Sequence, residues 1–328
     1  MRYLKAFLII LFFLNEGIVA EEVKKMDHQT SLFLQQVNST DEPELEAISI
    51  EETRRSITQS VAPSSIHSLA IADIKIPSSE TQIPLRIYTP KGNGPFPVYI
   101  SIHGGGWVFG NLDTHDPFCR NIAQKAQVVV VSIDYRLAPE HKYPAAFNDC
   151  YAAVDWVAKN IQDWKGDSSK LIIGGISAGG NLAAAVAIKA KEKNYPNLKA
   201  QVLICPVMEH SFETMSYQKY ADGYFLTKKD MQWFWEQYLA KAEDGKQPYA
   251  SPLLAPDVSG LPRAMVVLAD FDPLYDEGKA YGEKMKAANV AVTIQNYPTI
   301  HAITGHPFDV SKKAISDIAQ FLRDIHPN

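Results

Sequence analysis

The chain has 328 residues, of which 46% are apolar and 21% charged, and its formal net charge is -5. This balance excludes a disordered acidic tail and a basic nucleic-acid-binding protein, and the length favours one large α/β domain with an ample core. The three cysteines, Cys119, Cys150 and Cys205, are too few for a disulfide framework and lie in no metal-binding spacing. We expect them to be buried as small apolar residues.

The first twenty residues differ from the rest of the chain and predict an export signal. Arg2 and Lys5 supply a positive start, residues 6–14 form an uninterrupted apolar run, and the segment ends in small residues at Ala20. Nine apolar residues are too few for a membrane-spanning helix, which needs about 20. We therefore expect a signal peptide over residues 1–20, export to the periplasm or the exterior, and no stable membrane span.

The hydrophobic pattern divides the remaining chain into a helical start and a long α/β part. Residues 21–68 have the pattern of polar helices, and Ser49 with Glu52 forms a capping box. From residue 69 onward, two alternating segments predict antiparallel strands, and continuous apolar runs separated by helices predict a mostly parallel sheet covered on both faces. The expected strands are 69–77, 83–90, 98–103, 128–134, 170–175, 200–205, 264–270 and 290–297. The expected helices are near 114–126, 145–160, 178–193 and 276–288, with a terminal helix after the last strand. Residues 207–250 interrupt this alternation as an insertion.

Chemically distinctive residues follow four of the predicted parallel strands, at the sheet edge where α/β proteins bind ligands. The glycine-rich segment HGGGW, residues 103–107, follows one strand, and Ser177 follows another within the G-x-S-x-G pattern of residues 175–179. Asp272 and His301 follow two later strands. Serine is a weak nucleophile unless a base takes its proton, and the base needs a carboxylate that orients it and stabilises its charge. The order Ser, Asp, His therefore predicts a catalytic triad.

Backbone N–H groups near the serine predict a site for a developing negative charge. Glycine on both sides of the serine permits a tight turn from strand to helix, so that Ala178 starts a helix whose first N–H groups have no intrahelical acceptor. Gly105 and Gly106 allow the backbone to approach a substrate closely. We expect these three N–H groups to form an oxyanion hole, in which each donor contributes about 10²- to 10³-fold to turnover.

Other residues compete for the roles of base and acid. His306 lies five residues after His301, but it precedes a proline at an expected helix start, which is typical of a surface residue. Asp270 closes its strand, whereas Asp276 and Glu277 have the positions of first-turn residues stabilised by a helix dipole. We favour the aspartate and the histidine named above over these alternatives.

The sequence predicts neither a metal nor an organic cofactor. Asp113, His115 and Asp116 form an acidic and histidine-containing cluster, but two further well-spaced ligands are lacking. We expect this cluster to be a helix start, with Asp and Thr side chains as caps. The chain contains neither a G-x-G-x-x-G nor a GK[ST] phosphate-binding motif. The sequence leaves the oligomeric state open between a monomer and a homodimer.

Four segments resemble the hormone-sensitive-lipase group of α/β-hydrolases, also called bacterial esterase family IV. They are HGGGWVFGNLDTH, SIDYRLAPEHKYPAAFNDC, GISAGGNLAAAVA and DPLYDEG, and the similarity extends from roughly residue 30 to the C-terminus. Three features depart from the usual pattern. Ile176 stands where aspartate is common, His301 precedes Ala302 rather than glycine, and the loop between Tyr297 and His301 is one residue short.

The resemblance implies a carboxylester hydrolase of the α/β-hydrolase fold that acts on short to medium acyl esters. It identifies Ser177 as nucleophile, Asp272 as triad acid, His301 as base, and Gly105, Gly106 and Ala178 as oxyanion donors. It also implies that the N-terminal helices and the insertion form a cap. Residues 212–238 contain nine aromatic side chains, and their helical spacing assigns about half of them to a core within the cap. We expect Trp107, Tyr224 and Phe225 to line the substrate site.

Two other functions remain as alternatives. The gibberellin receptors of plants resemble this group but lack the catalytic histidine, so that a non-catalytic small-molecule binder on the same fold is one alternative. An amidase or peptidase is the other, because acyl transfer through a serine triad does not itself distinguish an ester from an amide.

Overall fold

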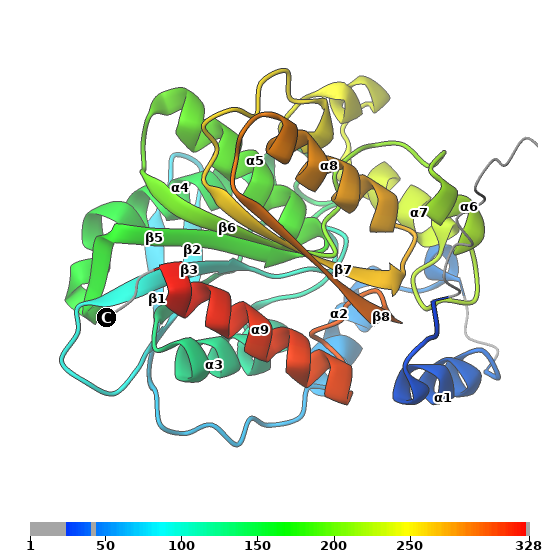
Figure 1. The fold of residues 1–328 in the computed structure, drawn as a ribbon, viewed down its shortest axis with the longest axis horizontal. Helices are drawn as coiled ribbons and strands as arrows, with labels where there is room; N and C mark the ends of the chain where they lie inside the picture. The colour runs from blue at the N-terminus through cyan, green and yellow to red at the C-terminus, as the bar shows by residue number, and fades with distance from the viewer. Residues whose placement is uncertain (1–23, 41–43, 326–328) are drawn as a thin grey trace, which may run out of the picture.

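The computed structural model describes residues 24–40 and 44–325 of the chain (Figure 1). The predicted signal peptide, residues 1–20, lies outside the described residues. Within the described part, no helix is both long enough and apolar enough to cross a membrane.

A mostly parallel sheet forms the centre of the molecule, as the sequence predicts. The described residues contain the strands β1 (Ala70–Pro77), β2 (Gln82–Thr89), β3 (Phe96–Ile102), β4 (Val129–Ile133), β5 (Gly166–Ile176), β6 (Leu198–Ile204), β7 (Arg263–Phe271) and β8 (Val292–Ile300). Their spatial order is β1-β2-β4-β3-β5-β6-β7-β8. The pairs β1–β2 and β2–β4 are antiparallel and all the other pairs are parallel. The central strands are buried on both faces, which explains their continuous apolar runs.

Helices cover both faces of the sheet (Figure 1). One face carries α3 (Leu112–Ala126) and α9 (Asp309–Ile325), and the other carries α4 (Ala145–Asn160), α5 (Ala178–Lys193) and α8 (Tyr275–Ala287). The predicted bounds of α4 and α5 agree with the structure, whereas α3 starts two residues before its prediction. Helix α3 starts early because Asn111 forms its N-cap and completes a capping box with Thr114. The shorter 3-10 helices are η1 (Leu45–Ala47), η2 (Ile161–Trp164), η3 (Ala242–Lys246) and η4 (Pro252–Leu254).

The last strand is longer than the sequence predicts. The apolar pattern ends at Tyr297, but β8 continues through Pro298 to Ile300, where Ile300 pairs with Phe271. Pro298 is tolerated because β8 is an edge strand, where a missing N–H leaves no partner unsatisfied. No loop therefore separates Tyr297 from His301, and the predicted short loop is instead the end of the strand.

The N-terminal helices and the insertion lie together at the carboxyl ends of the strands (Figure 1). The N-terminal part forms α1 (His28–Val37) and α2 (Ile50–Gln59), and the insertion forms α6 (Met215–Lys219) and α7 (Lys228–Tyr238). The two parts contact each other directly. Lys229 lies 3.4 Å from Glu44 and 3.5 Å from Glu46, and the Asn38 side chain donates a 3.0 Å hydrogen bond to the Gly223 carbonyl.

Candidate active site

Ser177 occupies the sharp turn between β5 and α5. Its backbone has a φ of 57° and a ψ of -120°, in a region that residues other than glycine rarely adopt. The neighbouring glycines are required by close packing. A Cβ at Gly175 would lie 2.2 Å from the Gly179 carbonyl oxygen, and a Cβ at Gly179 would lie 2.2 Å from the Ile102 carbonyl oxygen. The G-x-S-x-G pattern thus brings α5 against β3 and holds the serine at the end of its strand.

The structure brings Ser177, His301 and Asp272 together in one hydrogen-bonded chain. His301 Nε2 lies 3.0 Å from Ser177 Oγ, and His301 Nδ1 lies 2.7 Å from Asp272 Oδ2. All three side chains are buried. Asp272 Oδ1 also accepts the N–H of Leu274 at 2.9 Å, which orients the carboxylate. The imidazole is therefore placed to take the serine proton while a carboxylate orients its other nitrogen.

The competing acidic residues have other partners. Asp270 forms an ion pair with Lys24 at 2.5 Å. Asp276 accepts the backbone N–H of Ser216 at 2.8 Å. Glu277 is buried and accepts the backbone N–H of Met208 at 2.6 Å, and burial raises its pKa well above the ordinary value. None of these acidic residues has a hydrogen bond to His301 among the described contacts.

His306 is half-buried and not fully exposed as the sequence predicts. Its ring lies among Phe33, Phe225 and Phe308, with ring centroids 4.9, 5.2 and 4.9 Å away. Its Nε2 is buried without a hydrogen-bond partner among the described residues, and burial lowers its pKa to about 4. The expected surface position therefore holds only in part, because Phe33 and Phe225 come from distant parts of the chain and pack against the ring.

Ala302, directly after the triad histidine, has a left-handed backbone with a φ of 59°. An alanine Cβ is strained there, whereas glycine is not. We expect Ala302→Gly to raise the free energy of unfolding by about 0.5–1 kcal/mol, measured by urea denaturation. Ala314→Gly, at a buried position within α9, is the control and should lower it by about 1–2 kcal/mol, because the helix propensity and the burial of a methyl group are both lost. A loss of stability in Ala302→Gly would show that the turn is not strained.

The loop of residues 103–110, which carries two of the predicted oxyanion donors (the oxyanion loop), lies beside the serine, since a Cβ at Gly104 would lie 3.4 Å from Ser177 Cβ. Ala178 is the first residue of α5, where an N–H has no intrahelical acceptor. Gly105 and Gly106 have φ angles of 109° and 59°, and the hydrogen bonds of the described backbone leave their N–H groups without an acceptor. Space also requires glycine at both positions. A Cβ at Gly105 would lie 2.3 Å from the Phe109 carbonyl oxygen, and one at Gly106 would lie 2.1 Å from the Phe234 ring.

Comparisons of the sequence and of the fold with known proteins identify the family of the chain. A family model described as the alpha/beta hydrolase fold matches residues 99–304. The chain belongs to the α/β-hydrolase family. The carboxylic ester hydrolase LipN of Mycobacterium tuberculosis is 41% identical over 247 residues, which cover 74% of this chain and 65% of that protein. The arylesterase of Saccharolobus solfataricus is 35% identical over 255 residues, which cover 77% and 83%. The crystal structure of a thermostable esterase from Pseudomonas putida superposes with a TM-score of 0.87 at 37% identity, covering 92% of this chain and 97% of that one.

These comparisons confirm the resemblance to the hormone-sensitive-lipase group and the α/β-hydrolase fold that the sequence predicts. Ile176, where aspartate is common in the group, ends β5 and packs partly buried against the core beneath α3 and α9. The departure from the usual motif is therefore accommodated by apolar packing, and the turn at Ser177 keeps its geometry.

The three residues predicted to line the substrate site of this α/β-hydrolase lie in different environments. Trp107 is fully buried and stacks on Tyr238 at 4.2 Å with an interplanar angle of 2°. In this conformation Trp107 is inaccessible to a substrate, in contrast to the prediction, and it holds the oxyanion loop against α7. Tyr224 stacks on Phe271 and lines a cavity of about 360 Å³. This cavity lies near the acid loop, which is the segment of residues 272–274 that carries Asp272. Phe225 is 43% exposed.

Most aromatic residues of the insertion are core residues. Of the nine, six are buried: Tyr217, Tyr220, Trp233, Phe234, Trp235 and Tyr238. The fraction exceeds the half that helical spacing predicts because α7 packs on the oxyanion loop as well as on its own neighbours. Phe234 has a particular position, since its ring covers Gly106.

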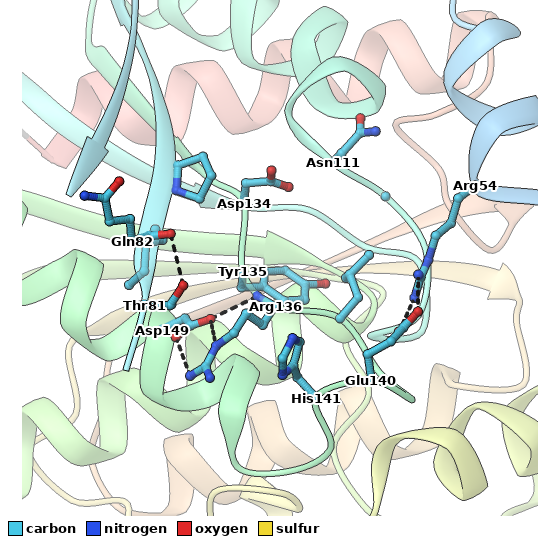
Figure 2. A pocket seen from close by; sticks show the side chains of 14 residues that line it. Arg54, Thr81, Gln82, Asn111, Asp134, Tyr135, Arg136, Glu140, His141 and Asp149 are labelled. Atoms are coloured by element: carbon cyan, nitrogen blue, oxygen red, sulfur yellow. Dashed lines mark hydrogen bonds and ion pairs between the residues drawn. The ribbon is translucent and has the colours of Figure 1, made fainter. Parts of the chain in front are cut away.

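A second cavity, of about 410 Å³, is lined by residues of α2, of the start of β2 and of the segment that follows β4 (Figure 2). Two guanidinium groups in its wall are already paired, Arg54 with Glu140 at 2.7 Å and Arg136 with Asp149 at 2.9 Å. Asp134 shows no side-chain hydrogen bond among the described contacts. Burial, and then the negative charge of Asp113, raise the pKa of Asp134 to about 6.

This raised pKa predicts a pH-dependent stability. The folded state binds the proton of Asp134 at about pH 6, whereas the unfolded chain binds it near 3.8, so that the folded state is penalised at neutral pH and gains stability as the pH falls through 6. We expect Asp134→Asn to be more stable than the wild type by about 1–2 kcal/mol near pH 8, and this advantage should disappear near pH 4. Urea denaturation at several pH values measures the free energy of unfolding of the variant and of the wild type. An advantage that does not change with pH would contradict the assignment.

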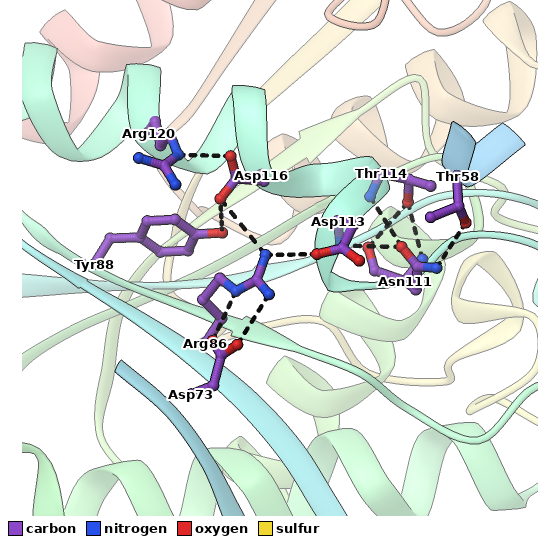
Figure 3. Close-up of polar contacts among 9 residues, drawn as sticks. All are labelled: Thr58, Asp73, Arg86, Tyr88, Asn111, Asp113, Thr114, Asp116 and Arg120. Carbon is purple, nitrogen blue, oxygen red and sulfur yellow. Dashed lines mark hydrogen bonds and ion pairs between the residues drawn. The ribbon is translucent and has the colours of Figure 1, made fainter. Parts of the chain in front are cut away.

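The acidic cluster at the start of α3 forms ion pairs with neighbouring arginines (Figure 3). Asp113 pairs with Arg86 at 2.8 Å, and Asp116 pairs with Arg120 at 2.6 Å. His115 points elsewhere and bonds Ser101 at 2.8 Å. The predicted helix start is confirmed. The predicted threonine cap is also confirmed, because Thr114 Oγ1 accepts the Asn111 backbone N–H at 2.9 Å, but the N-cap side chain is that of Asn111 and not an aspartate.

Cys205 is the residue near the triad that the sequence reasoning did not identify as functional. All three cysteines are buried and free, as predicted. Cys205, however, lies beside Asp272 and His301, and the donor atoms of the three residues are all within 4.8 Å of one another. No local pattern marks this position, since it depends on how β6 and β7 lie in the sheet.

Proposed function

We propose that the chain hydrolyses carboxylic esters through an acyl-enzyme formed on Ser177. The observation that carries the proposal is the hydrogen-bonded chain from Ser177 through His301 to Asp272. The ester hydrolases among the relatives support it, and so does the presence of the histidine, which a purely binding protein does not need. Asp272 supplies the charge that stabilises the protonated imidazole.

The reaction would proceed by two acyl transfers. His301 takes the proton of Ser177 as Oγ attacks the ester carbonyl carbon, and the oxyanion accepts hydrogen bonds from the N–H groups of Gly105, Gly106 and Ala178. The C–O bond to the alcohol then breaks, and His301 returns the proton to the leaving oxygen. A water molecule repeats the sequence on the acyl-enzyme and releases the acid.

We propose a preference for short to medium acyl chains. Side chains of the insertion pack on the oxyanion loop, and the ring of Phe234 lies directly over Gly106. Most of its aromatic side chains are buried in packing, so we expect the insertion to limit the length of the acyl chain that the site accepts. The N-terminal helices contact the same insertion, so that both parts together would act as a cap.

The direct test is turnover of a series of p-nitrophenyl esters. We expect acetate and butyrate to be hydrolysed faster than decanoate and laurate, with a rate that falls as the pH drops below about 6 to 7 because the base becomes protonated. A fluorophosphonate should label Ser177, as mass spectrometry of the peptides would show. Binding without turnover or labelling would favour a receptor, and faster cleavage of matched anilides than of esters would favour an amidase.

We propose that residues 1–20 direct export. The positive start, the short apolar run and the small residues before Glu21 support this proposal. Expression with a secretory host and mass spectrometry of the exported product should show an N-terminus at Glu21. An intact N-terminal methionine on a cell-associated protein would contradict it.

A further inference from the structure

The end of β6 and the segment that follows it hold the turn at Ser177. Ser177 donates its backbone N–H to the Ile204 carbonyl at 2.8 Å, and Val207 donates its N–H to the Ser177 carbonyl at 3.4 Å. Cys205 lies between these contacts with a φ of 42°, and its own N–H donates to the Val267 carbonyl at 2.8 Å. The segment thus holds the nucleophile turn by its main chain while Cys205 is fixed in an unusual backbone conformation.

The side chain of Cys205 lies at the bond between the triad acid and base. Its Sγ, a carboxylate oxygen of Asp272 and a ring nitrogen of His301 all lie within 4.8 Å of one another. Cys205 and Asp272 are each only 1% exposed. The carboxylate uses Oδ1 for the Leu274 N–H and Oδ2 for His301. The thiol is therefore a close neighbour of a buried charge whose orientation decides that of the imidazole.

The environment keeps this thiol in its protonated form. Burial, and then the negative charge of Asp272, raise the pKa of Cys205 well above the ordinary value. Since the thiolate is the form that attacks electrophiles, oxidises readily and binds metals, none of these roles suits Cys205. His301 Nδ1 and Asp272 Oδ2 are also separated by 2.7 Å, the length of a hydrogen bond rather than of two ligands around an ion. What remains is a compact, weakly donating S–H group.

We propose that Cys205 is a positioning residue of the triad, whose thiol holds the Asp272 carboxylate against His301. This inference rests on the proposed hydrolase function. A weak donor is suited to the role, because it packs against the carboxylate without neutralising the charge that must stabilise the protonated imidazole. A hydroxyl at the same place donates more strongly and withdraws part of that charge.

Two substitutions separate the effect of losing the thiol from the effect of adding a stronger hydrogen-bond donor. Cys205→Ser introduces the stronger donor, so the protonated imidazole loses stabilisation and the acidic limb of the kcat/KM profile moves to lower pH, by about half a unit. We also expect kcat to fall by roughly three- to tenfold, with KM nearly unchanged, because the loss is in the transition state. Cys205→Ala removes the thiol without adding a donor, so that kcat falls while the acidic limb stays in place. Cys119→Ser, at another fully buried cysteine, is the matched control and should change stability alone.

The measurements are pH profiles with p-nitrophenyl butyrate, corrected for the folded fraction from urea denaturation. Equal profiles for the wild type and Cys205→Ser, or the same effect in Cys119→Ser, would overturn the positioning role. If the wild type does not hydrolyse esters, the proposed function fails, and the downfield NMR signal of the His301 Nδ1 proton tests the positioning role by itself. That signal should shift in Cys205→Ser and not in Cys119→Ser. An unchanged signal would overturn the role independently of activity.

Discussion

Ser177→Ala should lose ester hydrolysis almost completely, with kcat lower by about 10³-fold or more. The residual rate would come from the oxyanion N–H groups and from substrate binding, which the substitution leaves in place. The fold should be unaffected, because among the described residues the side chain of Ser177 has a hydrogen bond to His301 alone. Steady-state turnover of p-nitrophenyl butyrate and a urea denaturation curve measure the two effects.

Ser132→Ala is the matched control for this substitution. Ser132 is fully buried in β4, and its hydroxyl has no hydrogen-bond partner among the described residues. We expect this variant to keep the wild-type rate. Substantial turnover by Ser177→Ala, or labelling of another serine by a fluorophosphonate in that variant, would assign the chemistry to a different nucleophile.

Asp272→Asn should lower kcat by about 10⁴-fold while leaving KM nearly unchanged. An amide in place of the carboxylate removes the negative charge beside the imidazole and can present an N–H to Nδ1, which then favours the tautomer with the proton on Nε2. That tautomer cannot accept the proton of Ser177. The effect is large because the carboxylate is 1% exposed and no solvent replaces it.

Asp270→Asn tests whether the neighbouring aspartate is the triad acid instead of Asp272. Asp270 pairs with Lys24, whose side chain is 42% exposed while that of Asp270 is 11% exposed, and a partly exposed pair of this kind contributes on the order of 1 kcal/mol to stability. We expect the rate of this variant to stay close to that of the wild type. If instead Asp270→Asn lost activity and Asp272→Asn kept it, the acid of the triad would be Asp270.

The sheet and its main helices were predictable because their signals are local. A strand buried on both faces needs a run of apolar residues, and a covering helix needs an apolar stripe, so that each leaves its own periodicity in the chain. The strand β8 shows the limit of this rule. Pro298 interrupts its pattern, and only its place at the sheet edge makes a proline acceptable there.

The errors at the site have one common physical origin. Trp107 and His306 were assigned by their neighbours in sequence, but their surroundings come from elsewhere. Trp107 is covered by Tyr238 of the insertion, and His306 is enclosed partly by Phe33 of α1. A side chain of either kind can be exposed or buried, and the choice depends on contacts between segments far apart in the chain. The position of Cys205 beside Asp272 and His301 was not predicted for the same reason, because those residues are distant in the sequence.

The sequence by itself determined the fold class, the family resemblance and the residues of the proposed triad, because glycine patterns and strand ends depend on nearby residues alone. Only the tertiary structure decided that the Ser177 hydroxyl meets the His301 ring, 124 positions further along the chain, at 3.0 Å. It also decided that the ring meets Asp272 beside a buried thiol. Such distances follow from the order and register of the strands in the sheet, which pair segments without regard to their separation along the chain.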